Sequence, residues 1–228
     1  DFDTWAFDVA IDELAAAPFT LCVDDGAIAL EVLTRCQRHI RRGNESPLLS
    51  RVLERHRALH DLAKPLVRAD YNHALDVWQW LLRLDSDASE ELQFAALFHD
   101  IERLASESDA RVEHLASDYQ RFKDAHAHKG AEIAASVLAE CGADAATCAR
   151  VAALVASHER PSDDAEVALL NDADALSFFS LNSNGYADYF GPEQTKKKVA
   201  YTLNRLRPAA RAKLDSVRLR PEIRTMLE

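Results

Sequence analysis

Apolar residues recur along most of this chain at the spacing of an α-helix. Val151, Leu154, Val155 and His158 stand at positions i, i+3, i+4 and i+7, which lie on one face of a helix. Every segment long enough to judge shows this period of about 3.6 residues, and none alternates between apolar and polar residues as a strand does. The chain is therefore predicted to be all-α, a bundle of amphipathic helices.

The pattern divides the chain into two parts at Pro65. Residues 1–64 are expected to form an N-terminal helical extension of two or three amphipathic helices that packs on the rest. Residues 65–228 are expected to form the main domain, with five further helices and a C-terminal helical part. The five helices are predicted at residues 71–84, 90–105, 125–141, 145–160 and 166–181.

Residues with strong terminal preferences mark several of these helix ends. Asp70 is expected to cap the first helix and Asp144 the fourth, because a side-chain oxygen there accepts a hydrogen bond from a backbone N–H of the first turn. Gly142 suits the left-handed position that follows the third helix. Pro161 is expected to end the fourth helix.

Polar residues interrupt the apolar faces of all five predicted helices. A single histidine on an apolar face is more often a hydrogen-bonded core residue, whereas a buried aspartate is rare without a partner. Here four successive helices each carry one histidine on or beside the core face, and the fifth adds two aspartates. The residues are His73, His99 with Asp100, His128, His158, and Asp172 with Asp174. Because imidazole and carboxylate together are a typical ligand set for zinc, iron or manganese, and helical bundles assemble such sites, we expect a buried metal centre.

The charge and composition narrow the class of partner. The formal net charge of −11 argues against broad contact with a nucleic-acid polymer, which needs a basic face. A small anionic substrate is compatible, because a buried metal ion can set the local field by itself. The chain has no run of about 18 apolar residues and no visible signal peptide, so no membrane contact and a cytoplasmic location are expected. Its four cysteines form no CxxC pair, and the sequence leaves open whether the chain forms a homodimer.

The ordered histidines and aspartates resemble the HD-domain superfamily of metal-dependent phosphohydrolases. The resemblance rests on His73, on His99 and Asp100 within AALFHDIER, on His128 within HAHKGAEIA, on His158 within VASHE, and on Asp174 within NDADAL. The two middle histidines match the branch of that superfamily that binds two metal ions. The resemblance covers roughly residues 71–180 and implies an HD-type helical bundle.

The resemblance also implies a ligand set. In that superfamily the first histidine, the His-Asp pair and the last aspartate hold one ion, while the paired aspartate reaches a second ion held by the middle histidines. Carried over, the first ion is held by His73, His99, Asp100 and Asp174. The second ion is held by Asp100, His128 and His158. Asp174 is preferred because the family usually reads ADxL at this point, with Asp172 kept as the alternative ligand.

One departure concerns a lysine that many family members carry in the sequence HDxGK, where it contacts phosphate or substrate. This chain reads HDIER, so Arg103 takes the place of that lysine. Its guanidinium can still bind an oxyanion, or it can pair with a neighbouring carboxylate. The expected catalytic residues are therefore Asp100, Arg103 and, more weakly, Lys129. Lys129 directly follows His128 and would point about a quarter turn away from it.

Two groups of residues lie beyond the expected metal centre. A basic run at residues 196–198, together with Arg205, is typical of a solvated face, although one of its members could reach over the site. Tyr186, Tyr189 and Phe190 either line a pocket or pack a helix junction. The sequence does not decide between these alternatives.

The resemblance implies two divalent metal ions, Fe, Mn or Zn, and such a pair is compatible with two kinds of catalysis. As Lewis acids they would activate a bridging water for hydrolysis of a small phosphoester, a nucleotide or similar compound. As iron, the same ligands would suit a mixed-valent di-iron oxygenase acting on a small polyol or phosphonate-like substrate, as in a minor branch of the superfamily. We expect the hydrolase, because most of the superfamily hydrolyses phosphoesters. A non-catalytic regulatory domain is a third alternative, but all six ligand positions are filled.

Overall fold

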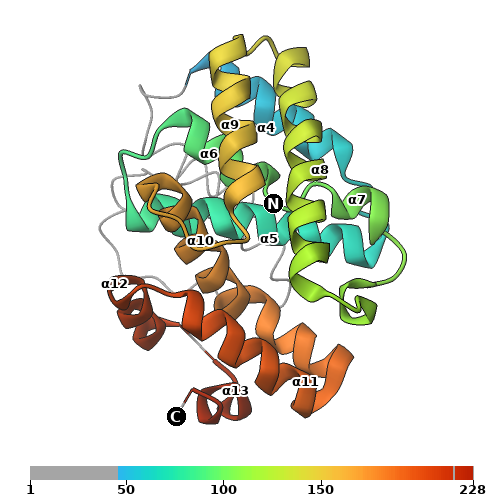
Figure 1. Ribbon diagram of the computed structural model, residues 1–228, viewed down its shortest axis with the longest axis vertical. Helices are drawn as coiled ribbons and strands as arrows, with labels where there is room; N and C mark the ends of the chain where they lie inside the picture. The colour runs from blue at the N-terminus through green and yellow to red at the C-terminus, as the bar shows by residue number, and fades with distance from the viewer. Residues whose placement is uncertain (1–45, 218, 228) are drawn as a thin grey trace, which may run out of the picture.

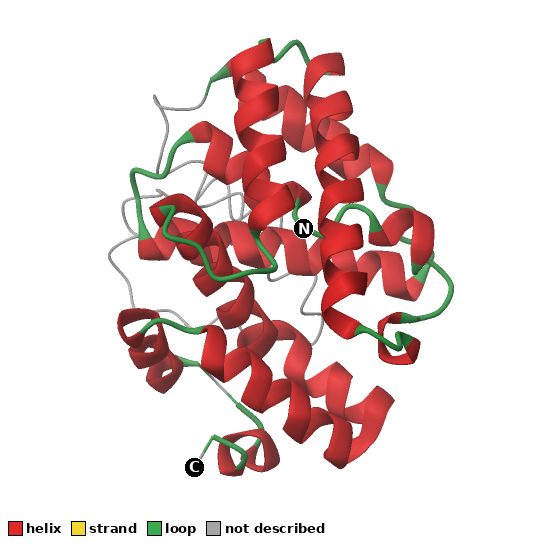
Figure 2. Cartoon of the chain, viewed as in Figure 1, coloured by secondary structure: helices red, strands yellow, loops and turns green. Residues whose placement is uncertain are grey.

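The computed structural model describes residues 46–217 and 219–227. Within these residues it contains helices and no strand, so the predicted all-α fold class is confirmed (Figure 2). The helices are α4 (Pro47–Leu59), α5 (Pro65–Leu84), α6 (Glu90–Phe98), α7 (Arg103–Ser106), α8 (Tyr119–Glu140), α9 (Ala145–Ser157), α10 (Ala165–Ser177), α11 (Ser183–Arg205), α12 (Pro208–Arg211) and α13 (Pro221–Thr225). The helices expected within residues 1–45 lie outside the described part of the chain.

The core lies where α5, α6, α9 and α10 meet, with α8 packed along α9 (Figure 1). α8 and α9 form an antiparallel pair, and α5 passes behind them to contact α6 and α10. The largest fully buried side chains of these helices include Trp78, Leu81, Phe94, Phe98, Leu138, Leu154, Leu170 and Leu176. Burying one such side chain stabilises the fold by about 1.5–3 kcal/mol, so this core holds the helices together where they meet.

Side-chain caps determine where α6 and α9 begin. Ser89 Oγ accepts a hydrogen bond from the backbone of α6 at 3.1 Å, and Asp144 Oδ1 accepts one from Thr147 N at 2.8 Å. Gly142, between α8 and α9, has a φ of 85°, a conformation that costs glycine little because it has no Cβ. The predicted roles of Asp144 and Gly142 are confirmed.

Asp70 does not cap a helix, and this prediction is wrong. α5 begins earlier, at Pro65, because proline at the first helical position has a suitable φ and lacks an N–H that would be unpaired there anyway. Asp70 therefore lies inside α5, where its two oxygens accept hydrogen bonds from the Arg111 guanidinium at 2.6 and 3.0 Å. Pro65 is the first residue of α5.

The helix predicted at residues 90–105 is interrupted at the candidate site. α6 ends at Phe98, and the chain turns through His99 and Asp100 before the short helix α7 begins. No glycine or proline marks this break in the sequence. The turn releases the His-Asp pair from the helical repeat, so both side chains can face the same interior point.

Two further helices differ from their predicted bounds. The helix predicted at 125–141 begins at Tyr119, because Asp118 Oδ1 accepts a hydrogen bond from a backbone N–H of the first turn at 2.9 Å. The helix predicted at 166–181 ends as an α-helix at Ser177 and continues as a π-helical turn. The earlier start of α8 places Lys123 and His126 in the body of a helix.

The part of the predicted N-terminal extension that the structure describes is residues 46–64, and its helix α4 packs on the main domain. Leu49 and Val52 are buried in the common core, and Arg51 Nε donates a hydrogen bond to Cys141 O at 2.8 Å. Across residues 46–217 and 219–227, we find no helix that combines the length and the apolar character needed to cross a membrane.

Candidate metal centre

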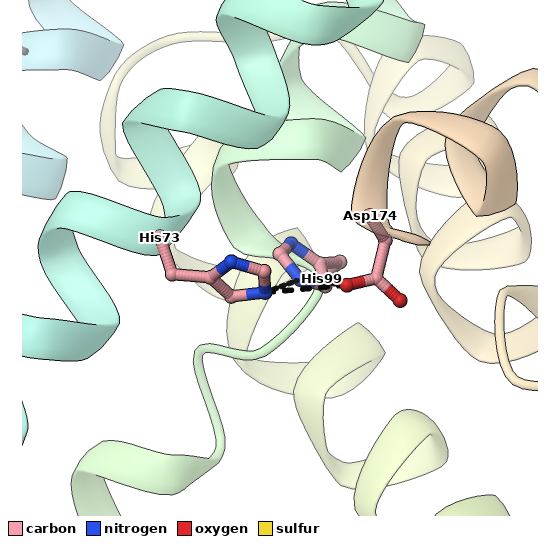
Figure 3. A group of neighbouring side chains, drawn as sticks. All are labelled: His73, His99 and Asp174. Carbon is pink, nitrogen blue, oxygen red and sulfur yellow. Dashed lines mark hydrogen bonds and ion pairs between the residues drawn. The ribbon is translucent and has the colours of Figure 1, made fainter. Parts of the chain in front are cut away.

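Three ligand-type side chains meet where α5, α6 and α10 converge (Figure 3). His73 projects from α5, His99 closes α6, and Asp174 projects from α10. His73 Nε2 lies 3.3 Å from His99 Nε2 and 3.2 Å from Asp174 Oδ1, and His99 Nε2 lies 3.8 Å from the same oxygen. Ligand atoms around a tetrahedral ion with bonds of about 2.0–2.1 Å are about 3.3 Å apart. These three atoms therefore suit one small cation.

Asp100 belongs to this group and also extends it. Its Oδ2 lies 4.0 Å from His73 Nε2 and 3.8 Å from His99 Nε2. Its Oδ1 lies 2.9 Å from Nε2 of His126 on α8. The two oxygens of one carboxylate thus face two different sets of imidazoles. We call the first set the first ligand group, which consists of His73, His99, Asp100 and Asp174.

His158, at the end of α9, completes the second set. Its ring is fully buried, with its centroid 5.4 Å from that of His99 and 6.5 Å from that of His126. Ligand atoms of Asp100, His158 and the neighbouring Glu159 all lie within 4.8 Å of one another. We call this set the second ligand group, which consists of Asp100, His126, His158 and Glu159.

Two of the histidines are oriented by the ends of their own helices. His99 Nδ1 lies 2.9 Å from Ala96 O, and His158 Nδ1 lies 2.6 Å from Val155 O. Each carbonyl belongs to the last turn of a helix, where backbone acceptors lack an intrahelical partner. A neutral ring that donates its Nδ1–H to that carbonyl carries no hydrogen on Nε2, whose lone pair then points into the cluster.

The other two histidines are oriented by side chains. His73 Nδ1 lies 2.9 Å from Ser177 Oγ, and His126 Nδ1 lies 2.7 Å from Glu102 Oε2. All four imidazoles therefore use Nδ1 for a supporting contact and present Nε2 to the cluster. Metal-binding histidines commonly have this arrangement, because the outer contact fixes the tautomer and the ring orientation.

Two buried atoms of the second ligand group lack a hydrogen bond. His158 Nε2 makes none among the described residues, although Glu159 Oε1 lies 3.2 Å away, and Glu159 Oε2 also makes none. A buried polar atom without a partner costs about 1–3 kcal/mol. A cation held between these atoms and Asp100 would satisfy them, so the donor set fits a metal ion.

The local charges favour the ligand forms of Asp100 and Asp174, and burial favours that of His99. Burial alone would raise the pKa of Asp100, but the Arg103 guanidinium and the adjacent imidazoles hold it well below its usual range. Burial has the same effect on Asp174, but the hydrogen bond with the His73 ring, the Arg205 guanidinium and the nearby imidazoles together outweigh it and hold the pKa well below its usual range. Burial lowers the pKa of His99 to about 4. At neutral pH the two carboxylates are therefore ionised and the His99 ring is neutral.

Residues 51–227 match the model of a family described as "Domain of unknown function (DUF4202)". The chain belongs to this family. The matched range contains every residue of both ligand groups. Comparisons with curated proteins and with solved structures found no match. The family description states no activity, so the chemistry of the site is the guide to function.

His128 does not reach either ligand group, which corrects its predicted place in the cluster. Its ring is exposed, and its Nδ1 lies 2.8 Å from Asp124 O within α8. His126 faces the cluster instead, because residues two apart on a helix point to nearly opposite sides. Gly130 lies one turn after His126, and this glycine is the feature of the sequence that indicates which of the two histidines faces the cluster. A Cβ at Gly130 would lie 3.5 Å from His99 O, so this face of α8 is the one that closely approaches α6.

The lysine near the ligand groups is Lys123 rather than Lys129. The Lys129 side chain is 62% exposed and pairs with Glu132 at 2.7 Å, away from the cluster. The Lys123 ammonium is buried and forms an ion pair with Glu159. Burial would lower the pKa of Lys123, but the carboxylates of Glu159 and Asp100 raise it, so this lysine stays charged. No feature of the sequence singles out Lys123, because a lysine on a helix is usually exposed.

Arg103 lies at the site, but carboxylates occupy its donors. Its Nε donates to Asp100 Oδ2 at 2.8 Å, while Nη1 and Nη2 donate to Glu107 and Glu113 at 2.5 and 3.2 Å. Arg103 therefore holds the carboxylate that both ligand groups share. Of the two roles expected for Arg103, binding an oxyanion and pairing with a neighbouring carboxylate, the structure shows the second.

The two candidate aspartates of α10 have different surroundings. Asp174 reaches the histidines, and its Oδ2 accepts a hydrogen bond from Arg205 Nη1 at 3.1 Å. Asp172 is buried on another side of the helix, where it accepts hydrogen bonds from Arg207 N at 2.9 Å and Arg207 Nε at 2.5 Å. Asp172 therefore anchors the start of α12, and the preference for Asp174 at the cluster agrees with the geometry.

A cavity of about 390 Å³ opens onto the first ligand group, with His73, Asp100 and Asp174 in its wall. Five positively charged side chains line it: Arg103, Arg111, Lys123, Lys198 and Arg205. Its aromatic wall consists of Phe178, Tyr186, Tyr189 and Phe190. The volume suits a small molecule. Four carboxylates line the same cavity, those of Asp70, Asp100, Glu113 and Asp174, so the positive side chains outnumber them by one.

Proposed function

We propose that this chain is a dinuclear metal-dependent phosphohydrolase that acts on a small phosphoester. The proposal is supported above all by Asp100, whose Oδ2 faces His73 and His99 while its Oδ1 faces His126. A carboxylate directed at two sets of imidazoles is what a pair of ions sharing one ligand requires. The set agrees with the resemblance to the HD-domain superfamily once His126 takes the place expected for His128.

The proposed ligands follow from the two groups. His73, His99, Asp100 and Asp174 would hold one ion, and Asp100, His126, His158 and Glu159 would hold the other. Two divalent cations at these positions would supply Lewis acidity and lower the pKa of a water molecule, which is the chemistry that phosphoester hydrolysis needs. The overall reaction joins the water oxygen to phosphorus and breaks the ester P–O bond, and the alcohol leaves with a proton.

The arginines of the site keep the ligand carboxylates in position. Arg103 Nε donates to Asp100, and Arg205 Nη1 donates to Asp174 Oδ2, so that Asp174 Oδ1 stays directed at the histidines. Arg205 Nη2 also donates to the carbonyl of His158 at 3.0 Å and so ties the two ligand groups together. Such outer contacts preserve ligand geometry, and losing one typically weakens metal affinity or activity by about 10–100-fold.

The charge of Lys123, although it is paired with Glu159, would add to the attraction of an anionic substrate. Lys123 lies in the cavity wall next to the second ligand group and remains protonated at Nζ. An ammonium in a largely dehydrated wall attracts a phosphate oxygen more strongly than one in water does. We therefore expect anionic phosphoesters to be preferred over neutral esters or polyols.

The experiment is metal analysis together with a hydrolysis assay. Protein loaded separately with Mn²⁺, Zn²⁺ or Fe²⁺ is tested on 4-nitrophenyl phosphate and bis(4-nitrophenyl) phosphate, with Asp100→Asn as the inactive control. Metal-dependent release of nitrophenol by the parent but not by the variant is expected. Bound iron with a visible absorption band and no hydrolysis would overturn the proposal in favour of an oxygenase. Protein that binds no metal would point to a regulatory domain.

A further inference from the structure

One cation of the cavity differs from the others in having no carboxylate partner. Arg103, Arg111, Lys123 and Arg205 each form an ion pair with a carboxylate. Lys198 forms none among residues 46–217 and 219–227. A cation that lines a cavity and forms no ion pair is available to a ligand from solution.

Aromatic rings surround the Lys198 ammonium. Its Nζ lies 5.8 Å from the centroid of Phe178 and 5.7 Å from that of Tyr201. Such contacts attract a cation by about 0.5–1 kcal/mol where water is present, so they hold the side chain without neutralising it. Its charge also acts within the cavity. Burial alone would raise the pKa of Glu113, but Arg103 and Lys198 lower it to about 2.

The backbone of α11 brings this lysine and the aromatic wall to the same cavity. Gly191 has a φ of 76°, and Pro192 follows it, so α11 consists of two segments joined by a kink. Tyr186 and Phe190 lie on the first segment, and Lys198 lies on the second. In an unbroken helix Lys198 would point about 80° away from Phe190, since successive residues differ by about 100°. The kink allows both segments to line the cavity.

The aromatic side chains form a continuous wall. The ring centroids of Tyr186 and Phe190 are 4.5 Å apart, and those of Phe178 and Tyr186 are 5.8 Å apart. Phe178 belongs to the π-helical turn that follows Asp174, so this wall begins directly beside the first ligand group. A flat or apolar group next to a reacting phosphate would pack against it.

We propose that Lys198 and this aromatic wall bind the distal part of the substrate, and that the substrate is a phosphoester whose flat or apolar body carries a second anionic group. The assignment of the reacting end to the ligand groups rests on the proposed function. The assignment of the distal end rests on the unpaired cation and the aromatic wall alone. Lys198 would therefore determine specificity rather than take part in bond breaking.

The test compares two substrates that differ only in the distal charge. With Mn²⁺-loaded protein, kcat/KM for 4-carboxyphenyl phosphate should exceed that for phenyl phosphate by about tenfold, the effect of one charged contact. Lys198→Met should lower the first value about tenfold more than the second, and Lys198→Arg should retain most of the preference. Lys197→Met is the matched control, because Lys197 is the exposed neighbour on the same helix, and it should change neither value.

A binding measurement separates this proposal from the hydrolase proposal. By calorimetry, the Mn²⁺-loaded parent should bind 4-carboxybenzylphosphonate about tenfold more tightly than benzylphosphonate, and Lys198→Met should lose that difference. If neither phosphate ester is cleaved but the binding difference is found, the hydrolase proposal fails and the distal site stands. Equal binding of the two phosphonates, or binding of neither, would overturn the distal site. An equal loss for both phosphate esters in Lys198→Met would also overturn it.

Discussion

The Nε2 atom of His126 lies 2.9 Å from Oδ1 of Asp100, and the same imidazole has its Nδ1 atom 2.7 Å from Glu102. The ring is therefore held between two carboxylates and directed at the aspartate that both ligand groups share. If the second ligand group binds an ion, His126→Ala should lose one of two ions, because it removes a ligand of that group only. The measurement is the metal content of the variant after loading with Mn²⁺ and dialysis.

His128→Ala is the matched control for this variant. It removes an exposed histidine from the same helix, two residues away, and should retain both ions. The opposite pattern, with His128→Ala losing an ion and His126→Ala keeping both, would contradict the assignment of ligands on α8.

The aspartates of α10 lead to a second prediction. Asp174→Asn should weaken the ion of the first ligand group, because the amide carries no charge, and should leave the ion held by His126 and His158. Asp172→Asn should keep both ions. It should instead lower the free energy of unfolding by about 1–3 kcal/mol, since buried Asp172 accepts two hydrogen bonds from Arg207. Metal content and urea unfolding distinguish the two variants, and loss of an ion from Asp172→Asn alone would contradict the ligand choice.

The third prediction concerns Arg103, whose guanidinium joins three carboxylates. Arg103→Met should lower the free energy of unfolding of the metal-free protein by about 3–5 kcal/mol, because it leaves buried negative charges without a partner. Mn²⁺ should restore part of this loss, since a cation at the ligand groups would compensate Asp100. The measurement is urea unfolding with and without Mn²⁺.

Arg55→Met provides the comparison for Arg103→Met. Arg55 pairs with Glu140 at the surface, where the two side chains are 42% and 55% exposed, so its loss should cost less than about 1 kcal/mol. Equal effects of the two variants would show that the contacts of Arg103 do not stabilise the fold as argued.

The fourth prediction is a pH dependence that arises from α4. Burial, and then the nearby His60 ring at 4.5 Å, hold the pKa of His56 well below its usual value of 6.5. The unfolded chain therefore binds a proton at His56 below about pH 6.5, whereas the folded chain does not. Stability should be complete above that pH and fall as the pH decreases, by up to about 1.4 kcal/mol per pH unit from this residue.

His56→Leu tests this dependence because leucine does not titrate. The drop in Tm between pH 7 and pH 5 should be smaller in His56→Leu than in the parent, whatever the absolute Tm of the variant. Exposed His128→Leu should keep the parent's drop. An unchanged drop in His56→Leu would show that another group controls the acid sensitivity.

The hydrophobic pattern is sufficient to predict the fold class and to predict on which side of its helix each of several site residues lies. A period near 3.6 residues identifies a buried helical face, so His73 and His158 were predicted on the correct sides of their helices. Asp144 and Gly142 were predictable because their roles depend on local backbone hydrogen bonds and conformation. Predicting these features requires only the identities of a few neighbouring residues along the chain.

The remaining features depend on tertiary contacts. The sequence HAH alone does not indicate which face of α8 is turned toward the core, because His126 and His128 are equally polar. Only the close approach of Gly130 to α6 distinguishes their faces. The end of α6 at His99 has no breaking residue in the sequence. There the imidazole contacts the carbonyl of Ala96 and takes part in closing the helix.

Anomalous diffraction from crystals of Mn²⁺-loaded protein tests whether Asp100 links two metal ions. Two manganese peaks are expected, one on either side of the Asp100 carboxylate. One should lie within ligand distance of His73, His99 and Asp174, and the other within ligand distance of His126 and His158. A single peak, or two peaks that do not share Asp100, would contradict it.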